Sequence, residues 1–302
     1  MKNDPILALA PMQDVTNLPF MQVIQEYGGP DYYVTEYFRV HADYSLEQKI
    51  LSSITKNKTG RPVYAQLIGQ DTEALVRVAN ELQAYPIAGI DLNLGCPAPV
   101  VCRKDAGGGL LRRREHMEHI IATLRDAISG KFTVKTRVGY DSHDEFPELL
   151  EIFKRYDIDT LTIHGRTVTE RYQTPIHPEC IRLAAEQMNC PVIANGNVVD
   201  VDTGIGAINK TKAAGLMIGR GAIRNPWIFD QLRASFSNQE PQTIVRADLL
   251  GYIDRLYHAI ASHAHDFDPS KHVNRMKKYM LYIVQGIDDA FEHRIRRVTS
   301  PE

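Results

Sequence analysis

Eight short apolar runs alternate along the chain with longer stretches of helical periodicity, and this alternation constrains the fold more than any other feature. Each run precedes polar or glycine-rich sequence and then a segment that favours a helix, which is the pattern of βα units and a parallel sheet. The predicted strands are Ile6–Ala10, Tyr33–Glu36, Val63–Leu67, Gly89–Asn93, Thr133–Arg137, Thr160–His164, Val192–Asn195 and Gly215–Ile218.

The number of units favours a closed α/β fold, the (β/α)8 TIM barrel, over an open doubly wound sheet. An open sheet usually has fewer strands and a GxGxxG turn after the first one, and Ala10–Gln13 contains no such turn. After the polar stretch Ser235–Thr243 the period becomes helical again. We therefore expect a catalytic barrel over residues 1–240 and a helical domain over residues 241–302.

Bulk properties restrict the function only loosely. The formal net charge of −2 gives no overall signal for nucleic acid, so an RNA site must come from local clusters of Lys and Arg. The cysteines lack paired CxxC spacing, the first residues lack the pattern of a secretory signal, and no apolar run approaches the roughly 20 residues of a membrane span. We expect a cytoplasmic protein without a membrane segment or a metal site.

Polar residues follow all eight predicted strands. A barrel carries its chemistry at the carboxyl ends of its strands, where the βα loops converge. One Gln or His at a strand end commonly satisfies a loop carbonyl, but eight polar ends together indicate a site. The ends are Pro11-Met12-Gln13, Thr35-Glu36, Gln66, Asn93 with Cys96, Lys135 with Arg137, His164 with Arg166, Asn195-Gly196-Asn197 and Gly219-Arg220-Gly221.

The last two of these loops indicate a phosphate site. Their glycines let backbone N–H groups approach an anion, Arg220 adds a positive charge, and barrels often bind phosphate after strands seven and eight. Either loop alone is as readily an ordinary turn. Gln66 and Lys135 could then face a pyrimidine-like ring edge of a phosphorylated cofactor such as a flavin. Lys135 could alternatively form a Schiff base in an aldolase-like barrel.

The residues at these positions resemble those of the tRNA-dihydrouridine synthases, and the resemblance covers nearly the whole chain. The matching segments are Ala10-Pro11-Met12, Thr35-Glu36, Tyr64–Leu67, Asn93–Pro97, Gly107–Leu111, Val134–Gly139, His164–Thr167, Val192–Gly196, Met217–Gly221 and Asn225-Pro226-Trp227.

The resemblance implies an FMN barrel with a helical C-terminal domain that reduces the C5–C6 double bond of uridines in tRNA with electrons from NADPH or NADH. It assigns Cys96 as the proton donor and Asn93 as a contact of the target nucleotide. The residues that it implies for FMN binding are Pro11, Met12, Gln13, Gln66, Lys135, His164, Asn195, Gly196, Asn197, Gly219 and Arg220.

A cysteine suits the chemistry that the resemblance implies. Hydride addition to C6 of uracil leaves charge on C5 and O4, which a proton must quench from the opposite face. A thiol with an ordinary pKa near ~8.5 is mostly protonated at neutral pH and can supply that proton. A free cysteine is more often a small buried apolar residue, but Cys96 lies between Gly95 and Pro97 just past a strand. Cys102, six residues later, is interpreted as structural.

The helical segment carries basic residues mixed with Tyr279 and Tyr282. Composition alone favours a solvated helix face, whereas the resemblance implies a domain that binds the tRNA backbone. The segments Thr35–Val40 and His272–Lys277 resemble the bacterial DusC branch, which acts at position 16 of the D-loop. The residues implied for RNA binding are Arg39, Asn93, Tyr172, Arg275, Lys277, Tyr282 and Arg297.

One segment departs from the family pattern. After Tyr172 the family usually has Gly and then an Ala-Asp-Trp run, whereas this chain has Gln173-Thr174-Pro175-Ile176-His177-Pro178. We expect this loop to alter RNA placement without affecting the flavin chemistry. Three other functions stay open: a flavin reductase of a free small molecule such as dihydroorotate or an enone, a Lys135 Schiff-base lyase, and an RNA-binding protein without redox activity.

Overall fold

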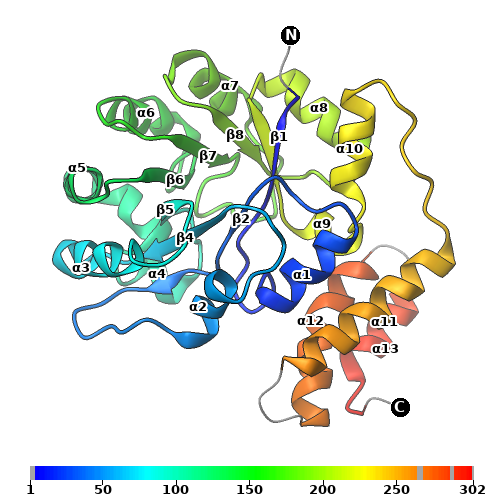
Figure 1. The fold of residues 1–302 in the computed structure, drawn as a ribbon. Helices are drawn as coiled ribbons and strands as arrows, with labels where there is room; N and C mark the ends of the chain where they lie inside the picture. Colours follow the sequence, from blue (N-terminus) through cyan, green and yellow to red (C-terminus); the bar gives the residue numbers. More distant parts are fainter. Residues whose placement is uncertain (1–3, 264–267, 286–288, 301–302) are drawn as a thin grey trace.

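In the computed structural model, which describes residues 4–263, 268–285 and 289–300, parallel strands form a barrel surrounded by helices (Figure 1). The strands pair in chain order, except that the second and the third both pair with the fourth. The strands of the described residues are β1 (Ile6–Leu9), β2 (Tyr33–Val34), β3 (Phe38–Arg39), β4 (Val63–Ile68), β5 (Gly89–Leu94), β6 (Lys131–Arg137), β7 (Thr160–His164), β8 (Val192–Asn195) and β9 (Gly215–Ile218).

The two edges of this sheet meet and close the barrel. On one side β1 pairs with β9, from Ile6 with Gly215 to Leu9 with Ile218. On the other side a parallel bridge joins Ala8 to Tyr32 at the start of β2. The predicted (β/α)8 barrel is therefore confirmed, and the predicted strands match the observed ones within two residues at each end.

The second strand is an exception, because the prediction of one strand over Tyr33–Glu36 is wrong in detail. β2 ends at Val34, and β3 resumes the pairing with β4 at Phe38. The cause is Thr35, whose Oγ1 accepts the hydrogen bond of the Gln66 N–H (3.1 Å) and so replaces a backbone carbonyl of the ladder. The chain then bulges, and the Glu36 carboxylate turns to the backbone of the loop after β1.

The helices that alternate with the strands lie outside the barrel, and the longer ones each bury an apolar face (Figure 1). Side-chain caps fix several starts; for example, Asp71 Oδ1 accepts from the N–H of Ala74 (3.0 Å). The helices are α1 (Leu18–Glu26), α2 (Gln48–Thr55), α3 (Thr72–Leu82), α4 (Pro99–Cys102), η1 (Gly107–Arg112), α5 (Arg114–Ala127), η2 (His143–Glu145), α6 (Phe146–Lys154), α7 (Pro178–Gln187), α8 (Val201–Thr211), α9 (Arg220–Arg224), α10 (Ile228–Phe236), α11 (Arg246–Ser262), α12 (Pro269–Ile283) and α13 (Asp289–Arg297).

The C-terminal helices α11, α12 and α13 form a separate layer beside the barrel (Figure 1). α12 docks on the loop between β1 and α1: the Tyr279 hydroxyl donates to the Val15 carbonyl (2.6 Å), and the Tyr279 ring stacks on Phe20. Lys278 also pairs with Asp14 (3.2 Å) in the same loop. Because this loop leaves the carboxyl end of β1, the helical layer reaches the rim where the strand ends converge.

Among the residues that the structure describes, no helix has the length and apolar character needed to span a membrane.

Candidate functional site

A chain of buried side chains connects the barrel interior to Cys96. Asp91 accepts hydrogen bonds from the Thr133 hydroxyl (2.6 Å) and from Gln66 Nε2 (2.7 Å). Gln66 Oε1 in turn accepts from Asn93 Nδ2 (2.9 Å). Asn93 Oδ1 then accepts from the backbone N–H groups of Gly95 and Cys96, each at 3.0 Å. The network therefore fixes the start of the cysteine loop from within the barrel.

This chain shows where two predicted site residues lie. Asn93 is 8% exposed, and its amide oxygen serves the cysteine loop, so at most its Nδ2 has hydrogen-bonding capacity left for a ligand. Gln66 is fully buried and keeps one N–H and one lone pair beyond the bonds given above. Burial raises the pKa of Asp91 to about 6 despite its hydrogen bonds from Thr133 and Gln66.

Cys96 is partly exposed and lies beside Tyr37, in the bulge between β2 and β3. The Tyr37 hydroxyl interacts with the Cys96 side chain and accepts a hydrogen bond from Arg39 Nη2 (3.2 Å). Cys102 is buried, and its thiol donates to the Cys96 carbonyl (3.4 Å). Cys102 therefore braces the loop, and Cys96 is the accessible thiol of the two.

Arg137, at the end of β6, joins the cysteine loop to the loop after β7. Its guanidinium is buried and donates to three carbonyl oxygens, those of Gly95 (2.8 Å), Thr167 (2.7 Å) and Arg171 (2.9 Å). It also lies 5.3 Å from the centre of the Tyr172 ring. Arg137 was predicted to lie at a strand end, but no role was predicted for it.

A cluster of basic side chains occupies the ends of β6 and β7. Lys135 Nζ donates to Asn195 Oδ1 (3.0 Å), and Asn195 Nδ2 donates to the Met217 carbonyl (2.7 Å). Burial and the neighbouring Arg137 lower the pKa of Lys135 to about 8. Burial, followed by the charges of Arg137 and Lys135, lowers the pKa of His164 well below its ordinary value, so this imidazole is neutral at pH 7. Such an excess of positive charge suits an anionic ligand.

The loops after β8 and β9, which are predicted to bind a phosphate, lie next to each other at the rim. Gly196 has a φ of +131° and Asn197 one of +56°, which turns the chain sharply beyond Asn195. Arg166 Nη2 donates to Asn197 Oδ1 (3.0 Å), and α9 begins at Arg220 directly after Gly219. The predicted residues Asn195, Gly196, Asn197, Gly219 and Arg220 thus lie on two adjacent loops.

The buried polar atoms that lack a hydrogen-bond partner among the described residues include His164 Nδ1 and Arg166 Nη1 in this region. A buried unpaired donor or acceptor costs about 1–3 kcal/mol, so such atoms indicate a polar ligand or water. FMN has an anionic phosphate and a polar ring edge, and these groups could supply hydrogen-bond partners for the two atoms. The residues of the site therefore fit FMN.

The loop after β1 completes the ring of strand ends. The Met12 N–H donates to the Thr16 hydroxyl (2.7 Å), and the Met12 side chain lies beside Gly219. Pro11 is partly buried and Gln13 is exposed in the same loop. Residues from β1 and β9, distant in sequence, therefore meet at one rim, as the barrel prediction requires.

The atypical loop Gln173–Pro178 touches the phosphate-type loops directly. Arg166 Nε donates to the Thr174 carbonyl (2.5 Å), and the His177 N–H donates to the Gly165 carbonyl (2.6 Å). Ile176 packs beside Gly165 and Gly196. The side chains and carbonyls of this loop therefore form one wall of the predicted phosphate region, and its expected lack of effect on the flavin chemistry stays a prediction.

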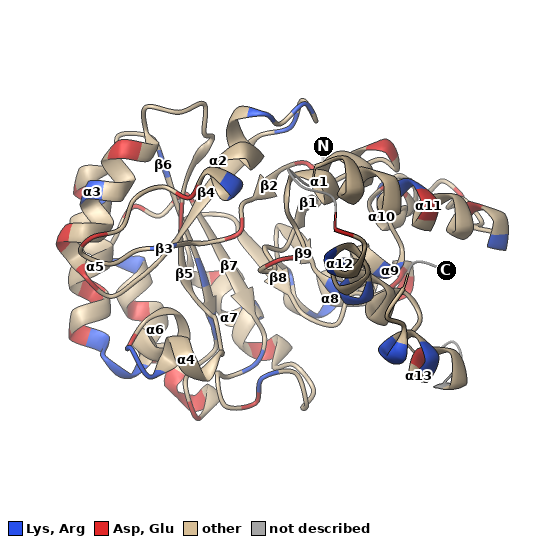
Figure 2. Cartoon of the chain, turned by 90° about the horizontal axis from the view of Figure 1, so that it is seen from below, with Lys and Arg blue, Asp and Glu red and all other residues tan. Residues whose placement is uncertain are grey.

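The residues predicted to bind RNA lie in two places. Arg39 and Tyr172 are exposed at the barrel rim, where Tyr172 also lies 5.0 Å from the Arg220 guanidinium. Arg275, Lys277 and Tyr282 are on α12 and Arg297 is on α13. Figure 2 shows blue basic segments on both helices, with acidic residues close by on α13.

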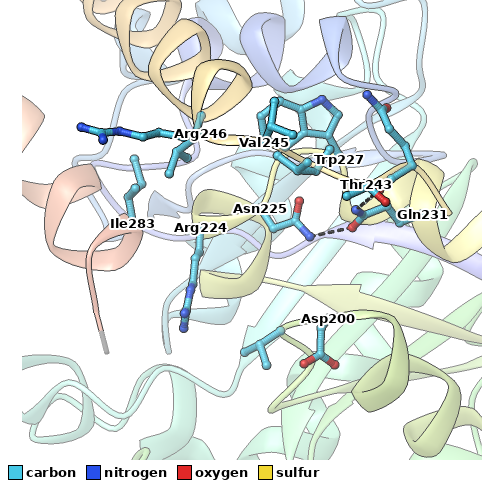
Figure 3. Close-up of a pocket in the computed structure, with 13 residues that line it drawn as sticks. Asp200, Arg224, Asn225, Trp227, Gln231, Thr243, Val245, Arg246 and Ile283 are labelled. Carbon is cyan, nitrogen blue, oxygen red and sulfur yellow. Dashed lines mark hydrogen bonds between the residues drawn. The ribbon is translucent and has the colours of Figure 1, made fainter. Parts of the chain in front are cut away.

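A cavity of about 590 Å³ lies between the loop after β8 and the helices α9, α10 and α11 (Figure 3). Trp227, Arg224 and Arg246 line it, and Asn225 Nδ2 donates to Gln231 Oε1 (2.7 Å) at its wall. Its lining contains none of the predicted site residues. Asn225 Oδ1 is also buried without a partner among the described residues. We nevertheless place the functional site at the barrel rim, because the lowered pKa values of Lys135 and His164 and the unpaired atoms of His164 and Arg166 occur together there, and we interpret this cavity as part of the joint between barrel and helical layer.

Four residues take part in this arrangement without a role predicted from the sequence: Tyr37, Asp91, Arg137 and Arg166. Asp91 carried a signal, because a carboxylate inside the apolar run Gly89–Leu92 must be paired when the strand is buried. Tyr37 carried none, since it was expected to follow a regular strand and the bulge at Thr35–Tyr37 sets its direction.

Comparison with known proteins places the chain in a family. The family model for dihydrouridine synthase (Dus) matches residues 8–301. A probable tRNA-dihydrouridine synthase from Staphylococcus epidermidis is 32% identical over 297 residues, which cover 96% of this chain and 88% of that protein. A probable tRNA-dihydrouridine synthase from Helicobacter pylori is 32% identical over 259 residues, which cover 84% and 78%.

Solved structures agree on the barrel. A variant of NCR from Zymomonas mobilis superimposes with a TM-score of 0.53 at 15% identity, covering 80% of this chain and 89% of that one. Histamine dehydrogenase from Rhizobium sp. 4-9 gives a TM-score of 0.58 at 12% identity, covering 77% and 46%. These likenesses concern the fold alone. The match over residues 8–301, together with relatives that align along most of their length, shows that the chain belongs to the dihydrouridine synthase family.

Proposed function

We propose that this chain is an FMN-dependent enzyme that reduces specific uridines in the tRNA D-loop to 5,6-dihydrouridine, with NADPH as the electron donor. The observation that carries the proposal is the position of Cys96 beside a rim that holds basic side chains and buried polar atoms without partners. Asn93 pairs in register with Lys135 across β5 and β6, so the loop that holds the thiol starts next to the cationic cluster. Family membership and the names of the relatives support the substrate.

Two groups of residues would hold FMN. Gly196, Asn197, Gly219 and Arg220, with Arg166 behind them, would bind the phosphate through backbone N–H groups and positive charge. On the ring side, the buried amide of Gln66, the ammonium of Lys135 and the neutral His164 offer donors and acceptors, and Pro11, Met12 and Gln13 would border them. When bound, FMN supplies the hydride that adds to C6 of uracil.

Cys96 supplies the matching proton. Its Sγ–H bond breaks as the C5–H bond of the base forms, so hydride and proton together reduce the double bond. Asn93 sets the direction of the thiol by holding the N–H groups of Gly95 and Cys96, and the Tyr37 hydroxyl contacts the side chain from the opposite loop. Arg137 fixes the same loop by donating a hydrogen bond to the Gly95 carbonyl.

The RNA would approach across the rim and the helical layer, residues 241–302. A target uracil must leave the folded tRNA to reach Cys96, at a cost of a few kcal/mol. We assign Asn93, Arg39 and Tyr172 as contacts near the base, and Arg275, Lys277, Tyr282 and Arg297 as contacts that position the tRNA. The docking of Tyr279 and Lys278 on the β1–α1 loop supports this arrangement, since it fixes the helical layer beside the strand ends. The segments Thr35–Val40 and His272–Lys277 favour position 16.

One observation favours a second candidate, a Schiff-base lyase. A lysine whose pKa is lowered to about 8 has a usable fraction of free amine near neutral pH, and Lys135 meets this condition. Borohydride added in the presence of carbonyl substrates would trap Lys135 covalently in that case. We expect no trapped adduct, because the Lys135 ammonium would donate hydrogen bonds to Asn195 and to the flavin and would not be free to attack a carbonyl.

The test begins with the visible spectrum of the purified protein, which we expect to be that of a flavin. The protein, reduced with NADPH or NADH, is then mixed with tRNA that lacks dihydrouridine, and in parallel with free uridine, orotate and an enone. We expect dihydrouridine in tRNA alone, mapped to the D-loop. Faster reduction of orotate or the enone would favour the small-molecule reductase, and a colourless protein that binds tRNA without forming product would favour an RNA-binding role.

A further inference from the structure

The loop between β1 and α1, residues 10–17, contains a tight turn in a conformation that its neighbours must hold. The N–H groups of Val15 and Thr16 both donate to the Met12 carbonyl, each at 3.0 Å. Asp14, within this turn, has a left-handed φ of +59°, which is uncommon for a residue other than glycine. Such conformations persist where the surrounding structure imposes them, often beside a ligand site. The residues that hold this loop from outside are therefore of functional interest.

The helical layer holds the loop through Tyr279 of α12. This side chain is 1% exposed, and its hydroxyl donates to the Val15 carbonyl (2.6 Å) and interacts with Asn17, the N-cap of α1. Lys278 pairs with Asp14 (3.2 Å), but about half of each of these two side chains is exposed. An exposed ion pair contributes little, whereas a buried carbonyl that loses its donor is costly. Tyr279 is therefore the main contact between the helical layer and the loop.

The barrel holds the same loop from the other side. Glu36, in the bulge between β2 and β3, is 1% exposed, and its carboxylate accepts backbone hydrogen bonds from Asp14 and Val15. Val15 thus contacts Glu36 of the barrel through its N–H and Tyr279 of the helical layer through its carbonyl. Lys49 of α2 adds an exposed pairing with Asp14 (3.3 Å). The loop is fixed in place only while both layers contact it.

We propose that Tyr279 is a positioning residue for the cofactor: through Val15 it holds the loop that borders FMN, so the helical layer contributes to flavin binding as well as to RNA binding. The inference rests on the proposed FMN site, because it concerns how the border Pro11–Gln13 is kept in place. The Met12 side chain lies beside Gly219, so a shift of this loop would change the space next to the phosphate region. A loop that is already ordered before binding raises affinity, since binding then does not have to order it.

The first test measures FMN affinity in the full chain after the flavin has been removed. FMN is titrated by fluorescence into the wild type, Tyr279→Phe and the matched control Tyr33→Phe. Tyr33 is also fully buried and its hydroxyl donates to a backbone carbonyl, that of Met21 (3.1 Å), but Tyr33 lies at the start of β2, away from the rim. We expect Tyr279→Phe to raise the Kd for FMN by about 3–10-fold and Tyr33→Phe to change it by less than about twofold, although both variants lose a buried hydrogen bond.

A second readout follows the coupling in the reverse direction. If docking of α12 favours FMN binding, FMN must favour docking of α12 by the same factor. None of the residues assigned to FMN lies on α12, so direct contact with FMN does not protect this helix. We expect FMN to slow amide hydrogen exchange in residues 269–283 of the wild type more than in α5, which lies on the opposite side of the barrel (Figure 1). In Tyr279→Phe this difference should disappear.

The outcomes separate this inference from the proposed function. Unchanged FMN affinity in Tyr279→Phe, or equal weakening in Tyr279→Phe and Tyr33→Phe, would overturn the positioning role alone and leave Tyr279 as a structural residue of the joint. A wild type that binds no FMN would overturn the proposed function together with this inference. Neither readout requires uridine reduction, so a protein that shows the predicted affinities but reduces no uridine would support the positioning role and contradict the proposed reaction.

Discussion

The barrel rim and the helical layer both carry positive charge, but they hold it in opposite ways. At the rim Arg137 is buried and Lys135 is partly buried, and hydrogen bonds to three carbonyl oxygens and to Asn195 fix their positions. On α12 and α13, Arg275 and Arg297 are exposed to solvent. Buried and fixed cations can define the geometry of one small ligand, whereas exposed cations supply charge to a large polyanion without specifying an atom. The first arrangement suits a cofactor and the second suits an RNA backbone.

The largest expected effect concerns the barrel rim, where the reaction would take place. Cys96→Ala should lower the rate of dihydrouridine formation by about 10²–10⁴-fold, because a positioned general acid is lost, while the flavin content stays that of the wild type. The rate is measured in single turnover with reduced protein and unmodified tRNA. Cys190→Ala is the matched control, since Cys190 precedes β8 at the opposite end of the barrel. An unchanged rate in Cys96→Ala would remove Cys96 from the mechanism.

The second prediction tests whether the buried cations at the rim are structural as well as electrostatic. Arg137→Met leaves the carbonyls of Gly95, Thr167 and Arg171 without their donor, so the free energy of unfolding should fall by about 2–5 kcal/mol. Chemical denaturation measures this loss. Arg155→Met, which removes an exposed pairing with Glu118, should cost less than about 1 kcal/mol. Equal losses in the two variants would contradict the distinction between buried and exposed cations.

The third prediction concerns the helical layer. Replacing Arg275, Lys277 and Arg297 together by Ala should weaken tRNA binding and reduce the slope of log affinity against log salt by roughly 0.7–0.9 for each lost phosphate contact. The flavin content should not change. Binding is measured by titration at several salt concentrations. Lys131→Ala, at the amino end of β6, is the control, and a triple variant that binds tRNA as that control does would show that the RNA lies elsewhere.

The smallest effect is a pH dependence of FMN affinity in the flavin-free protein. The pKa of Lys135 is lowered to about 8, so its positive charge is complete below that pH and is lost as the pH rises through it. FMN should therefore bind several-fold more weakly near pH 9 than near pH 7, measured by flavin fluorescence titration. Asp91, whose pKa is raised to about 6, changes charge below this window. In Lys135→Met the profile should be nearly flat, and a slope unchanged from the wild type would assign the titration to another group.

The same contrast explains how much the sequence could predict. The strand ends follow from apolar periodicity, and parallel pairing brings their polar residues to one rim, so the fold and the grouping of Lys135, His164 and Asn195 could be predicted. The bulge at Thr35–Tyr37 could not, because it depends on a side-chain hydroxyl that replaces a carbonyl across the sheet.

The hydrogen-bond partners of the site side chains could not be predicted from the sequence either. The resemblance implied that Asn93 contacts the nucleotide, but its amide oxygen holds the cysteine loop, which only the spatial order of Gln66, Asn93 and Cys96 reveals. The departure from the family pattern after Tyr172 was visible, yet its contacts with Gly165 and Arg166 depend on how the loop folds back. For the exposed cations of α12 and α13, neither pattern nor burial specifies which phosphates they would contact.

The central claim is that the rim holds FMN and delivers both hydride and proton to a uracil of tRNA. The most direct measurement mixes NADPH-reduced protein with unmodified tRNA and follows the flavin spectrum and the RNA product together. We predict that tRNA oxidises the flavin and that one dihydrouridine forms for each flavin oxidised, whereas free uridine at the same concentration reacts far more slowly. Flavin oxidation without dihydrouridine, or an equal rate with free uridine, would contradict the account.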